Sequence, residues 1–190
     1  RYRSVSRGLG DVYKRQGIWM KDVFLVYDKS CFYEIVILNY FMSFSNCDMV
    51  FCSLDGKPVR TMEGFSVNVD MPLEALEKDQ IRSFILPGGN IAEIDTPEVK
   101  SYLQALMKRE ILIAGICAGV DVLDHAGILC DVKSTHSSDE DWVTDKNVIT
   151  ARANAYVDFA VEVAKKLDLF ASEDDLQETI NFWKHYQRVQ

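Results

Sequence analysis

The sequence predicts an α/β fold, namely a single-domain α/β/α sandwich with a mainly parallel central sheet. Short apolar runs alternate with helical stretches, and most of these runs lack a polar face, as strands covered on both sides do. A length of 190 residues, of which 48% are hydrophobic, suits one globular domain with a substantial core. The sequence contains no internal repeat or linker that would divide the chain.

The first sixteen residues are not expected to belong to this domain. Residues 1–16 carry five Lys or Arg residues and one acid, and they show neither helical nor strand periodicity. The stretch SRGLGDVYKRQ resembles a translated transposase adapter of the kind used to prepare sequencing libraries. The leader lacks the apolar segment of a secretory signal, and a transit peptide is the alternative interpretation. We therefore expect a non-native leader at 1–16, a native start at Met20 and a domain over 20–190.

The first half of the chain is expected to contribute three strands, one helix and a β-hairpin. Continuous apolar runs indicate the buried strands, and alternating residues on either side of Glu63-Gly64 indicate the hairpin. The expected elements are a strand at 22–27, a helix at 32–44, a strand at 47–54, hairpin arms at 58–62 and 65–71, and a strand at 81–86.

The second half is expected to continue the alternation of strands and helices. Thr96 is a suitable N-cap for a helix that has Pro97 in its first turn, and Ser172 with Asp175 resembles a capping box. The segment 134–146 is polar and is assigned no regular structure. The expected elements are a helix at 97–109, a strand at 111–116, a helix directly behind Cys117, a strand at 147–150, a helix at 154–167 and a last helix from 172 onward.

Charge and cysteine content restrict the class of function. The chain has 21 Lys and Arg against 29 Asp and Glu, a net charge of -8 that disfavours nucleic acid or anionic lipid as a partner. Its apolar runs, such as 111–120, are too short to span a membrane. The five cysteines form no C-x-x-C and have no His at zinc-finger spacing. We expect a reduced, cytoplasmic protein without a metal.

Cys117 is the strongest candidate for a catalytic residue. Gly115-Ile116-Cys117-Ala118-Gly119 is a G-x-C-x-G at a strand-to-helix junction, the cysteine form of the nucleophile elbow. The sharp turn would expose the thiol at the carboxyl edge of the sheet, where ligands bind in open α/β folds. A helix N-terminus favours thiolate, so we expect a reactive thiol with a lowered pKa. The alternative is a buried, inert cysteine.

Two other segments are expected to reach the same edge. The turn Leu86-Pro87-Gly88-Gly89-Asn90 can direct backbone amides toward it, as an oxyanion requires, although an ordinary glycine-rich turn has the same composition. Glu34 lies in the first turn of the helix after the first strand, where its carboxyl group either overhangs the site or is solvated and complements the helix dipole.

Together these three features resemble the DJ-1/PfpI superfamily, within the flavodoxin-like, class I glutamine amidotransferase-like fold. The resemblance covers about Lys21 to Leu169 and includes Tyr33-Glu34, the LPGGN turn, the GICAG elbow, Ser134-Thr135-His136 and 148–167. It implies that Cys117 is the elbow cysteine, that Glu34 is its partner acid, and that the amides of Gly88, Gly89 and Ala118 form an anion pocket. It also implies a homodimer and no cofactor.

Departures from the family narrow the implied activity. Ala118 stands where PfpI-type proteases carry His, and the ARANA segment after 147–150 lacks the H-x-E of glutaminases. The CAG elbow with Glu34 matches the DJ-1 branch, which implies a glyoxalase- or deglycase-type enzyme that acts on small reactive carbonyls and has an oxidative-stress role. Two alternatives stay open: a non-catalytic redox sensor or chaperone-like protein, and a hydrolase of another small electrophile such as an amide or isonitrile.

Four further residues have candidate roles, of which those of His136 and Arg152 follow from the resemblance. His136 lies near the cysteine in the family and is either a proton shuttle or a residue that fixes the neighbouring loop. Asn90 and Arg152 are candidates for substrate binding, Arg152 either by steering carboxylates or as a solvated arginine. Cys31 is hypothesised to be a resolving thiol for Cys117. The expected partner is a small-molecule carbonyl or peroxide.

Overall fold

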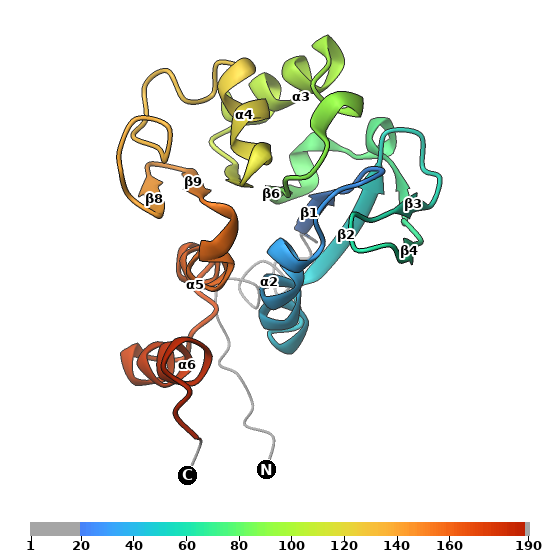
Figure 1. The fold of residues 1–190 in the computed structure, drawn as a ribbon. Helices are drawn as coiled ribbons and strands as arrows, with labels where there is room; N and C mark the ends of the chain where they lie inside the picture. The colour runs from blue at the N-terminus through green and yellow to red at the C-terminus, as the bar shows by residue number, and fades with distance from the viewer. Residues whose placement is uncertain (1–19, 189–190) are drawn as a thin grey trace.

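The computed structural model describes residues 20–188, so the expectation of a non-native leader at 1–16 lies outside the described residues. Strands and helices alternate along the chain as expected (Figure 1). The strands are β1 (Lys21–Leu25), β2 (Asp48–Ser53), β3 (Val59–Arg60), β4 (Ser66–Val67), β5 (Met71–Pro72), β6 (Ile81–Leu86), β7 (Leu112–Ile116), β8 (Trp142–Asp145) and β9 (Val148–Ala151). The helices are α2 (Tyr33–Phe44), α3 (Pro97–Met107), α4 (Ala118–His125), α5 (Tyr156–Lys166) and α6 (Glu173–His185).

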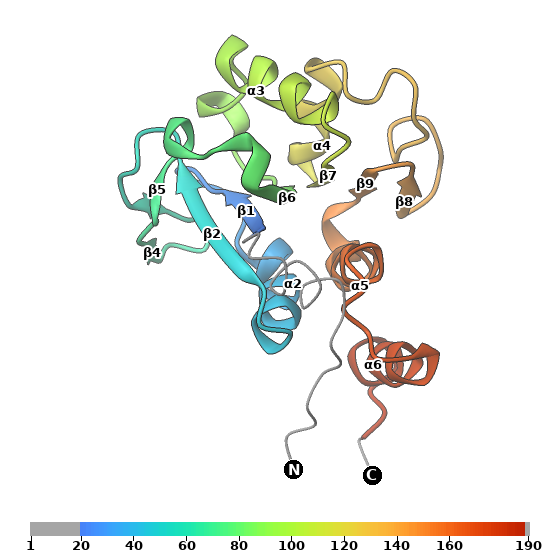
Figure 2. The ribbon, with the colours of Figure 1, turned by 180° about the vertical axis from the view of Figure 1, so that it is seen from behind.

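The central sheet is mainly parallel, as the sequence predicts. Its seven strands follow the order β5-β2-β1-β6-β7-β9-β8, and only β8 runs antiparallel to its neighbour. Figure 2 shows β5 and β8 at opposite edges of the sheet. The strands β1, β6 and β7 lie side by side in its middle, so the three segments that follow them meet at one edge.

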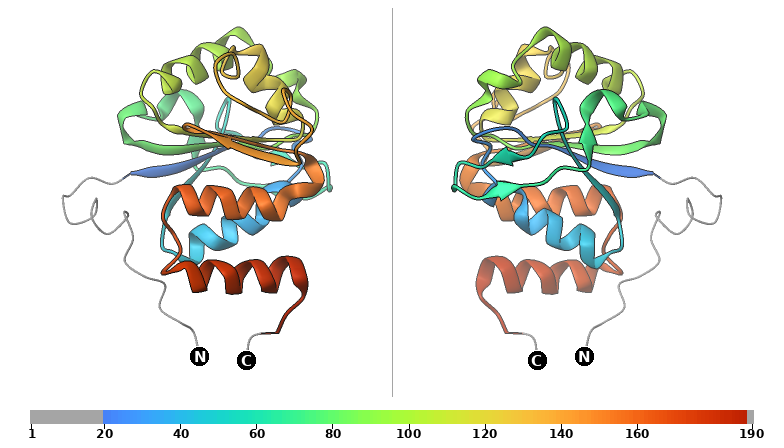
Figure 3. Two further views of the ribbon diagram at one scale, coloured as in Figure 1. Left: turned by 90° about the vertical axis from the view of Figure 1, so that its left-hand side faces the viewer. Right: turned by 90° about the vertical axis from the view of Figure 1, so that its right-hand side faces the viewer.

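Helices cover both faces of the sheet, which confirms the α/β/α sandwich. Figure 3 shows α3 and α4 on one face, α2 and α5 on the other, and α6 outside the α2–α5 layer. Each face has its own apolar core: Phe84, Leu103 and Leu123 belong to the first, and Ile35 and Phe159 to the second. Among the described residues, no helix is long and apolar enough to cross a membrane.

The predicted helix caps are confirmed at two helices. The Thr96 side chain accepts a hydrogen bond from the amide of Val99, and that of Ser172 accepts one from the amide of Asp175. The Asp175 carboxylate accepts the amide of Ala171 in turn, at 2.8 Å. Local sequence therefore sets where α3 and α6 begin.

Two regions differ from the expectation. The hairpin forms, but its antiparallel pairing is limited to β3 and β4, and the end of its second arm joins β2 in parallel as β5. The polar segment 134–146 contains an unexpected strand, β8. Of its four residues only Val143 is buried, because β8 lies at the sheet edge with one neighbour. An edge strand needs few apolar residues, so the apolar-run criterion missed it.

Candidate active site

Cys117 occupies a strained elbow between β7 and α4. Its backbone angles are φ 55° and ψ −131°, a conformation that residues with a side chain rarely adopt. The Cys117 amide donates to the carbonyl of Ala151 on β9 at 2.9 Å. A side chain at Gly119 would collide with the carbonyl of Leu86, so the second glycine of the elbow lets α4 start directly against the end of β6. The predicted nucleophile elbow is therefore present.

The glycine turn after β6 lies against the elbow on one side and Glu34 on the other. The amide of Gly88 donates to Oε2 of Glu34 at 2.7 Å, while the carbonyl of Gly88 accepts from the amide of Cys31 at 2.8 Å. A methyl group at Gly88 would lie 2.7 Å from Cβ and 3.0 Å from Sγ of Cys117. Gly88 thus allows the carboxyl group and the thiol to approach the same turn.

Gly88→Ala is expected to disrupt the site and destabilise the fold by about 1–3 kcal/mol, because the added methyl overlaps the elbow. Urea denaturation and the rate of iodoacetamide reaction at Cys117 measure the two effects. Gly127→Ala is the matched control: at φ 75° it introduces backbone strain, but its nearest new neighbour is Sγ of Cys130 at 3.9 Å. An alanine at Gly88 that changes neither quantity more than the control would contradict this role.

Glu34 and Cys117 form a coupled acid–thiol dyad. Glu34 is 1% exposed, and burial raises its pKa to about 7, although the hydrogen bond from the Gly88 amide and the side chains of Cys117 and Tyr33 act to lower it. Burial likewise raises the pKa of Cys117 to about 11, with the Glu34 carboxylate as the second cause and the Ala118 amide opposing it. Because the two groups interact, the values describe the dyad as a unit.

The expectation of a lowered thiol pKa is wrong for this geometry. The N-terminus of α4 does act on Cys117 through the Ala118 amide, but burial and the carboxylate of Glu34 outweigh it. The start of the helix can be predicted from the sequence. The burial of the thiol and the identity of the acid that faces it cannot. Between about pH 7 and pH 11 the dyad holds one proton, and thiolate forms when that proton resides on Glu34.

Two backbone amides remain available beside the thiol. Among residues 20–188 the amide of Gly89 has no hydrogen-bond acceptor, and the amide of Ala118 faces Cys117. The φ of 122° at Gly89 and the carbonyl of Lys29 next to it leave no room for a side chain. The amide of Gly88, by contrast, is already bonded to Glu34. Of the three predicted anion-pocket amides, those of Gly89 and Ala118 are therefore not bonded to Glu34.

Three residues at the site, Tyr27, Glu63 and Asp121, were not predicted from the sequence. The hydroxyl of buried Tyr27 donates to the carbonyl of Pro87 at 2.7 Å, and burial followed by Glu34 raises its pKa, so it stays protonated. Glu63 raises the pKa of Glu34, and Asp121 that of Cys117, by charge repulsion. Three sequence features could have indicated these residues. Tyr27 ends a buried strand, Glu63 belongs to the Glu-Gly turn of the hairpin, and Asp121 is an acid four residues after the elbow cysteine.

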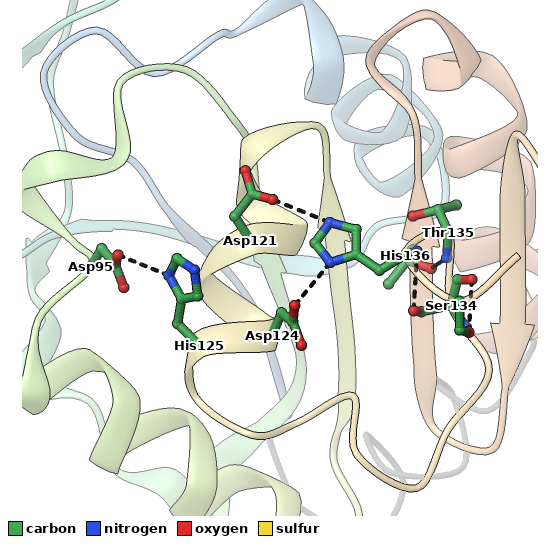
Figure 4. A network of polar contacts seen from close by, with 9 residues as sticks. Asp95, Asp121, Asp124, His125, Ser134, Thr135 and His136 are labelled. Carbon is green, nitrogen blue, oxygen red and sulfur yellow. Dashed lines mark hydrogen bonds and ion pairs between the residues drawn. The ribbon is translucent and has the colours of Figure 1, made fainter.

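His136 is held by two aspartates of α4. Its Nε2 lies 3.1 Å from Oδ1 of Asp121, and its Nδ1 lies 3.1 Å from Oδ2 of Asp124 (Figure 4). The amide of the preceding Thr135 donates to the Thr150 hydroxyl on β9 at 3.0 Å. Within residues 20–188, neither ring nitrogen contacts Cys117 or Glu34. These contacts favour the loop-fixing role over the proton shuttle.

The other candidate residues have mostly structural contacts. The Asn90 side chain caps a short 3-10 helix by accepting from the amide of Ala92. The Arg152 guanidinium lies 2.9 Å from Asp139 and 3.8 Å from Asp141. These two carboxylates offset the positive charge with which Arg152 would steer an anionic substrate. Cys31 does lie at the site, because its amide donates to the carbonyl of Gly88 at 2.8 Å. Burial, followed by the charges of Glu34, Glu63 and Cys117, raises the pKa of its thiol to about 11.

No metal site is evident in the described part of the chain. Within residues 20–188 there is no group of three or more His, Cys, Asp or Glu side chains that could hold a metal ion. His125 Nδ1 lies 2.9 Å from Asp95 Oδ2, a contact between α4 and the loop before α3 that Figure 4 marks with a dashed line.

The fold and site together define a class: flavodoxin-like α/β proteins with a cysteine on a nucleophile elbow and a buried acid beside it. Comparison with known proteins gives the family. The DJ-1/PfpI family model matches residues 20–166, and the chain belongs to this family. A relative from Bacillus subtilis (strain 168), named uncharacterized protease YoaZ, is 32% identical over 153 residues, which are 70% of this chain and 70% of that protein.

Solved structures agree on the fold. The DJ-1 superfamily protein Atu0886 from Agrobacterium tumefaciens superposes with a TM-score of 0.79 at 26% identity, covering 88% of this chain and 100% of that one. Oxidized DJ-1 of Toxoplasma gondii gives a TM-score of 0.73 at 19% identity, covering 86% of this chain and 97% of the other. At that lower identity the similarity supports the fold alone.

Proposed function

We propose that this protein is a cysteine-dependent, cofactor-independent enzyme that acts on small 2-oxoaldehydes, as a glyoxalase- or deglycase-type catalyst. One observation carries the proposal: Cys117 and Glu34 meet at Gly88, the Ala118 amide acts on the thiol, and the amide of the adjacent Gly89 has no acceptor among the described residues. A nucleophile, a proton carrier and an oxyanion pocket are the groups that addition to an aldehyde requires. The substrate class itself comes from the family resemblance.

The reaction with methylglyoxal needs no external oxidant. Cys117 Sγ bonds to the aldehyde carbon, its proton passes to Glu34, and the former carbonyl oxygen is stabilised by the amides of Gly89 and Ala118 before it is protonated. Through Glu34 the proton on this carbon is transferred to the neighbouring ketone carbon, and the hydroxyl proton is transferred to the ketone oxygen. The first carbon is thereby oxidised to a thioester and the second is reduced to an alcohol. Water cleaves the thioester, releasing lactate and the thiol.

Glu34 suits this role because of its second oxygen. Oε2 accepts from Gly88, whereas Oε1 is buried without a hydrogen-bond partner among the described residues. A buried acceptor without a partner destabilises the ionised acid, and a proton on Oε1 removes much of that cost. A carboxyl group that gains and loses a proton near neutral pH is suited to general acid–base catalysis.

The activity is expected to fall by about tenfold per pH unit as the pH drops below about 7. Below that pH both members of the dyad carry a proton, so neither thiolate nor base is available. Above it, one proton is shared and the thiolate form becomes accessible. Measuring kcat/KM for methylglyoxal between pH 5 and 9 tests this, and a flat profile across pH 7 would contradict the assignment of Glu34.

Peptide hydrolysis is supported less well. Release of an amine requires a group that protonates it, and in proteases related to this family a histidine directly follows the cysteine. Ala118 occupies that position, and both ring nitrogens of His136 face aspartates. We therefore do not propose protease activity for this chain, although the Bacillus subtilis relative is named an uncharacterized protease.

A redox function is the second candidate, favoured by the position of Cys31, whose amide donates to Gly88, the glycine that lies against Cys117. Hydrogen peroxide would oxidise the two thiols to a disulfide with release of two waters, or Cys117 alone to a sulfinate. Mass spectrometry after graded peroxide treatment separates the outcomes. Selective sulfinate at Cys117 without aldehyde turnover favours a sensor, and absence of a Cys31–Cys117 disulfide removes the resolving role of Cys31.

A further inference from the structure

Two carboxylates border the dyad without belonging to it. Glu63 is exposed in the turn of the hairpin, and its Oε1 accepts from the amide of Tyr33 at 2.8 Å, which fixes its charge beside Glu34. Asp121 lies one helical turn after Cys117 on α4, with its side chain 46% exposed. We call Glu63 and Asp121 the acidic rim.

The charge of the acidic rim is only partly compensated. His136 contacts both Asp121 and Asp124, so even a protonated imidazole balances one of two negative charges. The guanidinium of Arg152 faces Asp139 and Asp141. Glu34 adds a further negative charge whenever it is ionised. The acidic rim and its neighbours Asp124 and His136 therefore keep a net negative charge, which disfavours the approach of an anion.

The charges of the acidic rim act on the titratable groups of the site. Glu63 raises the pKa of both Glu34 and Cys31, and Asp121 raises that of Cys117. Each effect requires that the rim carboxylate lies close enough for its charge to act on the dyad. The contacts of both rim residues can be kept when the carboxylate is replaced by an amide side chain. Gln at position 63 and Asn at position 121 retain an acceptor oxygen for the Tyr33 amide and for His136.

We propose that Glu63 and Asp121 are specificity-determining residues that make Cys117 select uncharged or cationic electrophiles and reject anionic ones. A neutral 2-oxoaldehyde approaches without penalty, whereas a 2-oxo acid brings a carboxylate against the acidic rim. The preference among substrates rests on the proposed function. The charge selectivity of the thiol does not, because it concerns any electrophile that reaches Cys117.

Paired alkylating agents test the charge selectivity without any enzyme assay. Iodoacetamide is neutral and iodoacetate is anionic, and both react with the same thiolate, so the ratio of their rates at Cys117 cancels changes in thiolate fraction. Site-resolved mass spectrometry supplies the two rates. We expect Glu63→Gln or Asp121→Asn to raise the iodoacetate-to-iodoacetamide ratio about threefold each and about tenfold together, with smaller effects at high salt.

Glu173→Gln is the matched control, because Glu173 is an exposed acid on α6, in the layer outside α2 and α5. It removes the same formal charge and should leave the ratio unchanged. A wild-type ratio equal to that of a free uncharged thiol, or equal shifts in the control and rim variants, would overturn the proposal.

Substrate kinetics then test the link to catalysis. In the double variant, kcat/KM for 4,5-dioxopentanoate, a 2-oxoaldehyde that carries a carboxylate, relative to methylglyoxal should rise about tenfold. If the wild type turns over neither compound but the alkylation ratios shift as expected, the proposed function fails and the charge selectivity stands. If turnover occurs and the ratios do not respond to the rim variants, the charge selectivity fails and the function stands.

Discussion

Cys117→Ala is expected to lower the conversion of methylglyoxal to lactate by about 10³-fold or more, because the substitution removes the atom that forms the covalent bond. The fold should survive, since alanine is smaller than cysteine and the Cys117 amide keeps its bond to Ala151. Chiral quantification of lactate from purified wild type and variant measures the effect directly.

Cys130→Ala provides the matched control for this experiment. Cys130 is an exposed free cysteine just beyond α4, and it makes no contribution to the dyad. Its removal should leave turnover unchanged and exclude a general loss of thiol reactivity as the explanation. Residual activity in Cys117→Ala close to that of the wild type would mean that another group performs the addition, and the proposed function would fall with it.

Glu34→Gln is expected to lower turnover by about 10²–10³-fold while making the protein more stable at alkaline pH. The folded-state pKa of Glu34, about 7, lies above its ordinary value of 4.5, so the folded protein holds this proton more tightly than the unfolded chain. Stability is therefore lost as the pH rises from about 4.5 to about 7. Glutamine cannot ionise, and its oxygen can still accept from Gly88.

The gain in the free energy of unfolding should reach about 3 kcal/mol at pH 8 and nearly vanish at pH 4.5. Urea denaturation of wild type and variant at these two pH values provides the comparison, with Glu173→Gln as the control acid. A variant whose stability follows the wild-type pH dependence would show that Glu34 is not a buried acid with a raised pKa. The opposite signs of the two effects separate catalysis from folding.

The parts of the site that lie within one short segment could be predicted from the sequence. The elbow is encoded by Gly115 and Gly119 around Cys117, and the turn by Gly88 and Gly89, because only glycine fits the close approaches there. The parallel sheet follows from apolar runs that have no polar face. Glu34 needed the family resemblance, since one acid near a helix start carries little information.

Contacts between distant segments could not be predicted. The bond from the Tyr33 amide to Glu63 joins α2 to the hairpin, and the position of His136 depends on how the loop before β8 crosses α4. The prediction of a lowered thiol pKa was wrong for the same reason. The pKa of Cys117 is set mainly by burial and by Glu34, and neither can be read from the residues adjacent to the cysteine.

The backbone angles of Cys117 imply a trade-off between stability and activity. A residue with a side chain at φ 55° and ψ −131° costs the fold on the order of 1–3 kcal/mol. A glycine would adopt these angles with little strain, yet it would remove the nucleophile. Glu34, through its buried charge, likewise lowers the stability of the native state. A stability-driven redesign of this protein would therefore change Cys117 and Glu34 first, and would yield a more durable but inactive scaffold.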